Sequence, residues 1–237
     1  MNWMAKMRLN GATTAVASSK PGVMLADGGA PNLRTTNGLK EFLWLLGDIP
    51  QARILDLGPI WQSTVNFFVE KGFRIGTEDL LRGWKEFLSV EEESLRRKPV
   101  GSATSLNGDV DDIPVSTIAE RFLDGALQYP DESVHGILAW DLLDYFDAEM
   151  APRVAARLFR MLCPGGAMLG LFHSRPAAAF HRYRIVDRQT IEQLPAPSLA
   201  AHAHVFRNRE LMDMFAQFRS SKTFVGRDQV REALFLK

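Results

Sequence analysis

Two apolar segments that lie far apart in the sequence constrain the fold most strongly. Residues 53–58 read RILDLG, a short apolar strand that ends at an acidic residue and a glycine. Residues 157–172 read RLFRMLCPGGAMLGLF, which is the end of a helix, a Pro-Gly-Gly turn and a second apolar strand. Short strands that are apolar throughout are typical of the buried centre of a parallel sheet, whose strands are connected by helices.

Helical and strand-like patterns alternate around these two segments. Leu39, Phe42, Leu43 and Leu46 recur at helical spacing, and Thr36 or Asn37 is the predicted N-cap of that helix. The further predicted elements are a helix over 65–69, a strand over 73–77, a helix over 80–90, a helix over 115–123 that runs into a short strand near Arg121–Asp124, a strand over 134–140, a helix over 151–162 and a strand over 167–172. This order predicts an α/β fold with a doubly wound, mostly parallel sheet of about seven strands and helices on both faces.

The last third of the chain has a different pattern. Strand-like pieces at 182–187 and 204–207 flank a loop that contains two prolines, and residues 208–218 form an amphipathic helical pattern. Two β-runs, 222–225 and 230–236, are joined by Gly226-Arg227-Asp228. A connection that short predicts an antiparallel hairpin at the end of the chain.

The domain organisation follows from where this regularity is lost. Residues 1–30 are rich in Gly, Ala, Ser and Thr and have no periodicity, which predicts a flexible N-terminal tail. Residues 31–237 are predicted to form one domain with insertions near 91–114 and 180–207. The first insertion is interpreted as a solvated segment, and the alternative is a lid over a ligand crevice.

Composition excludes several classes of protein. Acidic and basic residues balance at 28 each, so no overall field favours nucleic acid or an anionic membrane surface. Cys163 is the single cysteine, which excludes an internal disulfide and fits a reducing compartment. No apolar stretch is long enough to span a bilayer, and the N-terminus lacks the apolar core of a secretory signal. These features predict a cytoplasmic protein without a membrane partner.

The segments 53–58 and 157–172, together with the acidic strand end FRIGTED at 73–79, resemble the class I S-adenosylmethionine-dependent methyltransferases. The resemblance covers residues 32–237. It implies a Rossmann-like fold in which a reversed final strand inserts beside its predecessor. It also implies S-adenosylmethionine as cofactor and a small-molecule or protein methyl acceptor as partner.

The resemblance places the cofactor at the carboxyl ends of the strands, where open α/β sheets bind ligands. Asp56, Gly58 and Pro59 then belong to the loop that approaches the amino acid part of the cofactor. The family pattern is roughly D-x-G-x-G-x-G, whereas residues 56–62 read DLGPIWQ and keep only the first glycine. Pro59 lacks an N–H donor, and Ile60 places a branched side chain where the family leaves room for a close backbone approach.

Five more candidate cofactor-binding residues follow from the resemblance. Glu78 or Asp79 would accept both ribose hydroxyls, because a carboxylate has two acceptor oxygens; the alternative is a solvated acidic helix start. Asp124 would meet the adenine amino group, and its alternative is an exposed turn aspartate. Trp140 and Asp141 would line the pocket, with Asp141 or Asp144 as an acid/base or orienting group.

The catalytic residues are not assigned by the sequence. His173 follows a strand and is either a general base or, as the favoured interpretation, a hydrogen-bonded surface group. The histidines do not form a cluster that would predict a metal.

Three functions from different classes fit these patterns. The leading hypothesis is methyl transfer. The alternative, which the Pro59-Ile60 loop favours, is a non-catalytic methyltransferase-like binding or assembly protein. A dinucleotide enzyme fits least, since no GxGxxG follows the first strand. Aromatic residues in the inserted segments would permit a homodimer.

Overall fold

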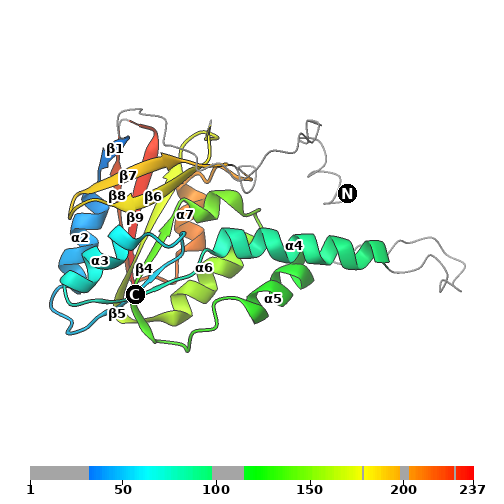
Figure 1. Cartoon of the computed structure of the whole chain (residues 1–237), viewed down its shortest axis with the longest axis horizontal. Coiled ribbons are helices and arrows are strands. Elements are labelled where there is room, and N and C mark those ends of the chain that lie inside the picture. The colour runs from blue at the N-terminus through cyan, green and yellow to red at the C-terminus, as the bar shows by residue number, and fades with distance from the viewer. Residues whose placement is uncertain (1–31, 98–114, 178, 198–202, 227) are drawn as a thin grey trace, which may run out of the picture.

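The computed structural model describes residues 32–97, 115–177, 179–197, 203–226 and 228–237, and these form two sheets with helices around them (Figure 1). In spatial order, the larger sheet consists of β3 (Arg74–Thr77), β2 (Arg53–Asp56), β4 (Val134–Trp140), β5 (Leu162–His173), β9 (Val230–Leu236) and β8 (Ser220–Val225). The first four strands are parallel, and β9 is antiparallel to both of its neighbours. The predicted fold class, including the reversed final strand, is confirmed.

Helices cover both faces of this sheet. On one face lie α2 (Asn37–Leu46) and α3 (Gln62–Glu70), and on the other lie α4 (Leu80–Arg97), α5 (Val115–Gly125), α6 (Met150–Met161) and α7 (Asn208–Met214). Successive strand residues point to opposite faces of the sheet. Ile54 therefore belongs to the hydrophobic core beneath α2 and α3, and Leu55 belongs to the core on the other face. Thr36 is the N-cap of α2, since its Oγ1 accepts the N–H of Leu39 at 3.0 Å.

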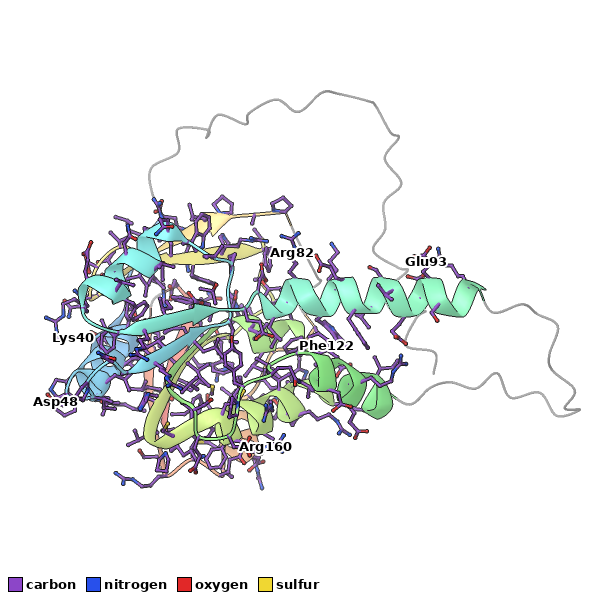
Figure 2. The ribbon with its side chains drawn as sticks, turned by 60° about the horizontal axis from the view of Figure 1, so that its bottom comes forward. Lys40, Asp48, Arg82, Glu93, Phe122 and Arg160 are labelled. Carbon is purple, nitrogen blue, oxygen red and sulfur yellow. The ribbon has the colours of Figure 1, made fainter. Side chains whose placement is uncertain are left out.

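The predicted strand near Arg121–Asp124 is wrong, because α5 continues through it. The Phe122 ring lies 4.9 Å from that of Trp84 and 5.5 Å from that of Phe87, both on α4. This packing between helices holds the segment helical, and the larger sheet has six strands in the described residues instead of about seven. Figure 2 shows Phe122 against α4, whose far end carries Glu93 beyond the sheet. The helix α4 thus takes in the start of the predicted insertion, and residues 98–114, with the lid alternative, lie outside the described residues.

The second predicted insertion forms most of a small antiparallel sheet. Its strands, in spatial order, are β1 (Leu33–Thr35), β7 (Thr190–Pro195) and β6 (His181–Ile185). In Figure 1 this sheet lies at the end of the larger sheet that is opposite the C-terminus. The predicted strand-like piece at 204–207 is wrong: these residues lead into α7, where Glu210 accepts the backbone N–H of Arg207 at 2.6 Å.

Within the described ranges, no helix combines the length and the apolar composition that a membrane crossing requires. The predicted N-terminal tail lies outside the described residues.

Candidate functional site

The candidate site lies at the carboxyl ends of β2, β3 and β4. Strand β2 is the point at which the strand order reverses, since β3 pairs with one of its edges and β4 with the other. Ligands of open α/β sheets bind in the crevice at such a point. The structure brings residues of all three strand ends to one cavity here. Of the cofactor-binding residues predicted from the sequence, five line this cavity: Gly58, Pro59, Asp79, Trp140 and Asp141.

This cavity is narrow. Its volume is about 30 Å³, which holds about one or two water molecules. Sites for cofactors and drug-sized ligands typically have volumes of roughly 300–1,000 Å³. Besides residues of the strand ends, the cavity is lined by His181, Arg182 and Tyr183 of β6 and by Phe180, which immediately precedes that strand.

Asp56 joins the glycine loop to the end of β4. Its buried Oδ1 accepts the backbone N–H of Gly58 at 2.9 Å and the Nε1–H of Trp140 at 2.6 Å. Burial raises the pKa of Asp56 to about 6, although both hydrogen bonds act in the opposite direction. Asp56 therefore fixes the walls of the cavity from beneath.

Trp140 is held in an unusual backbone conformation at this point. Its φ of 48° lies in the left-handed region, which a bulky residue adopts only under strain from its surroundings. A side chain at Gly58 would meet the Trp140 ring, because an added Cβ would lie 3.0 Å from Cδ1. The first glycine of the loop thus makes room for Trp140, while the side chain of Ile60 is exposed.

The two acidic residues after β3 have different environments. Glu78 turns toward the segment before β4, where its Oε1 accepts the N–H of Leu127 at 2.9 Å. Asp79 accepts the N–H of Arg82 in the first turn of α4 at 3.2 Å, and it also lines the cavity. Its Oδ2 lies 3.8 Å from Nη1 of Arg182 on β6. Where the sequence left two carboxylates open, the structure sets only Asp79 on the cavity wall.

Asp124 is not brought to the cavity. It is exposed near the end of α5, and its backbone carbonyl accepts a hydrogen bond from the Gln128 side chain at 2.8 Å. The structure thus shows Asp124 as an exposed aspartate, which is the alternative to a role at the adenine amino group.

Tyr183 is the main residue of the site that the sequence does not single out. Its hydroxyl donates to Oδ2 of Asp141 at 2.9 Å. Its ring stacks on Trp140, with centroids 5.4 Å apart and planes inclined by 9°. Burial raises the pKa of Asp141 to about 6, against the effects of His173 and of the Tyr183 hydrogen bond. The only sequence signal was the alternation of residues 182–185, which predicts a strand without saying what it covers.

His173 and Asp144 form a second polar pair behind Asp141. Asp144 is fully buried, and its Oδ2 accepts the backbone N–H of His173 at 2.7 Å and lies 3.0 Å from its Nδ1. Burial alone would lower the pKa of His173, but the hydrogen bond to Asp144 and the charges of Asp141 and Asp144 leave it raised. Nδ1 lies 4.0 Å from Asp141, so His173 contacts the carboxylate that lines the cavity.

In the part of the chain that the structure describes, no group of three His, Cys, Asp or Glu side chains has the geometry to hold a metal ion.

Comparisons with known proteins find similarity among solved structures. No family model and no curated protein match the sequence. The 1,6-didemethyltoxoflavin-N1-methyltransferase of Burkholderia thailandensis is 14% identical, over 84% of this chain and 76% of that chain, with a TM-score of 0.44. A SAM-dependent methyltransferase of Archaeoglobus fulgidus is 11% identical, over 84% and 93%, with a TM-score of 0.44. One from Methanosarcina mazei is 15% identical, over 80% and 94%, with a TM-score of 0.39.

Proposed function

We propose that this chain is a transferase that binds S-adenosylmethionine at the carboxyl edge of the larger sheet and transfers its methyl group to an acceptor. One observation carries the proposal. The buried carboxylate at the end of β2 holds the glycine loop and Trp140 beneath a cavity that Asp79 and Asp141 line, at the point where the strand order reverses. The sequence resemblance supplies the identity of the cofactor.

The residues present suit parts of such a cofactor. Asp79 offers two carboxylate oxygens, which match a pair of neighbouring ribose hydroxyls. Gly58 and Pro59 line the side on which the amino acid part would lie, and Trp140 forms an apolar wall. The volume of about 30 Å³ does not hold the whole cofactor, so binding requires the side chains of β6 to move away.

The bound cofactor would supply an electrophilic methyl group, and the chain would mainly orient the acceptor. In-line placement of two reactants accounts for a large part of such a barrier without dedicated catalytic groups. Asp141 is in a position to accept a proton from the acceptor, because its pKa of about 6 leaves it ionised at neutral pH. Phe180 and His181 line the same cavity from the β6 side and are proposed to face a small-molecule or protein acceptor. The cytoplasmic location and the homodimer stay predictions.

A specific observation also favours the non-catalytic alternative. The stacked rings of Trp140 and Tyr183 occupy the space in which a cofactor would lie, and Pro59 removes a backbone donor from the loop. In that case the site is filled by the chain's own side chains, and the fold serves a binding or assembly role.

Thermal unfolding with added ligands separates the two functions. S-adenosylmethionine or S-adenosylhomocysteine at about a hundred times its dissociation constant should raise the free energy of unfolding by about 2.7 kcal/mol. For a chain of this size that raises the unfolding midpoint by about 5–10 °C. A shift with these two ligands and none with NAD supports methyl transfer. No shift at millimolar concentrations contradicts it and favours the non-catalytic function.

A further inference from the structure

Strand β6 crosses the carboxyl edge of the larger sheet and makes three contacts along it. At one end the N–H of Ile185 donates to Oγ1 of Thr64, in the first turn of α3, at 3.0 Å. In the middle Tyr183 stacks on Trp140 and hydrogen-bonds to Asp141. At the other end Arg182 approaches Asp79. The strand therefore extends over the candidate site from α3 to the start of α4.

Each contact engages a group that a ligand at this edge would use. The hydroxyl of Thr64, in the first turn of α3, is a polar group at this edge, and it accepts the N–H of Ile185. The flat face of Trp140 is covered by another ring, and Asp79 has a guanidinium beside it. The small remaining volume is the direct result.

The small sheet is anchored at the opposite edge from β6. In the order β1-β7-β6, strand β1 is joined to the larger sheet by an ion pair, because Nη1 of Arg34 lies 3.0 Å from Oε1 of Glu232 on β9. Strand β6 contacts the larger sheet and α3 through one stacked pair, two hydrogen bonds and a partly exposed ion pair, and it also buries Tyr183 and Ile185 in the core beneath α2 and α3. The four polar and aromatic interactions are individually modest, and within the described residues the Arg182 side chain and the Tyr183 hydroxyl take part only in these. Displacement of its side chains leaves the anchor at β1 intact.

We propose that β6 is an autoinhibitory strap, in which Tyr183 and Arg182 hold the cofactor side of the site closed until they leave Trp140 and Asp79. The inference rests on the proposed function. If the open state is a minor one of about 10% or less, the apparent affinity for cofactor is reduced by at least about tenfold. Variants that release the strap should recover that affinity.

The test is the dissociation constant of S-adenosylhomocysteine, measured by isothermal titration calorimetry on the full chain. Tyr183→Ala should bind about tenfold or more tightly than wild type, and Arg182→Ala should bind more tightly by a smaller factor. Tyr183→Phe keeps the ring and loses only the hydrogen bond to Asp141, so it should also bind more tightly than wild type. This variant replaces Tyr183→Ala in the test if Tyr183→Ala does not fold. Arg184→Ala is the matched control, because Arg184 pairs with Glu192 inside the small sheet and should bind as wild type does.

The outcomes distinguish the strap from the proposed function. Tighter binding by the Tyr183 and Arg182 variants, with Arg184→Ala unchanged, supports both. Binding by wild type with equal or weaker binding by those variants overturns the strap and leaves the function in place. Absence of binding by every variant overturns both. A second readout on wild type is hydrogen exchange at the Ile185 amide, which should lose protection when S-adenosylhomocysteine binds.

Discussion

At the scale of single residues, the site consists of two carboxylates, each hydrogen-bonded to an aromatic side chain. Asp56 accepts from Trp140, Asp141 accepts from Tyr183, and the two rings are stacked on each other. Both carboxylates are buried, and burial raises the pKa of each to about 6. Their charges therefore cost stability at neutral pH, and the hydrogen bonds offset part of that cost.

The pH dependence of stability tests the state of Asp56. Its folded pKa is above its unfolded value, so the folded state binds more protons and stability falls as the pH rises from about 4 through about 6. Asp56→Asn removes the charge and keeps Oδ1, which accepts both hydrogen bonds. We expect this variant to be more stable than wild type by on the order of 2 kcal/mol at pH 8, with the difference vanishing near pH 4. Urea unfolding at several pH values measures it, and a difference independent of pH would contradict the assignment.

Cofactor affinity tests the choice between the two acidic residues after β3. In the Arg182→Ala background, where the contact of β6 with Asp79 is already absent, Asp79→Asn keeps an N-cap for α4 but loses one charged acceptor, so S-adenosylhomocysteine should bind about tenfold more weakly than to Arg182→Ala alone. Glu78→Gln is the control, because its amide oxygen still accepts from Leu127 and its side chain lies off the cavity wall. Titration calorimetry compares them. A larger loss for Glu78→Gln than for Asp79→Asn would reverse the ribose assignment.

At the scale of elements, sequence periodicity predicts those helices and strands whose conformation is set by their own residues, and it fails where contacts with distant segments decide. The face of α2 and the strand 134–140 follow from spacing alone, and the structure confirms them. The sequence leaves Thr36 or Asn37 as the N-cap of α2, and the structure shows that it is Thr36. The segment 121–124 is decided instead by the rings of Trp84 and Phe87 on another helix. Tyr183 could not be assigned to the site because it meets Asp141 through the small sheet, whose pairing no local pattern reveals.

Packing of α4 on α5 should depend on rings rather than charges. Phe122→Ala removes a buried ring from Trp84 and Phe87 and should cost about 3–5 kcal/mol. Arg121→Ala breaks a partly exposed ion pair with Glu91 and should cost about 1 kcal/mol or less. Urea unfolding compares the two variants. Equal losses of unfolding free energy would contradict this prediction, since they would show that the ion pair contributes as much as the aromatic cluster.

At the scale of the whole molecule, a buried ion pair joins the two sheets. Glu232 on β9 accepts from Thr36 and from the N–H of Gly38, and lies beside the guanidinium of Arg34 on β1. All of these groups are buried, so removing Glu232 leaves the buried Arg34 with Asp228 as its remaining carboxylate partner. The position of the small sheet over the candidate site therefore depends on residues at its far edge, on strands that carry no ligand-binding group.

A double-mutant cycle tests this junction. Glu232→Gln leaves the buried Arg34 with only the Asp228 carboxylate and should lower the free energy of unfolding by about 3 kcal/mol. Adding Arg34→Met removes the buried positive charge and should restore part of that loss. The coupling should exceed about 0.5 kcal/mol, the range within which independent sites are additive. Hydrogen exchange should rise across β1 and β7 in Glu232→Gln and stay unchanged in β2 and β4, since only the small sheet loses its anchor. Additive costs, or exchange that rises equally in both sheets, would show that the sheets are held together by their apolar contacts.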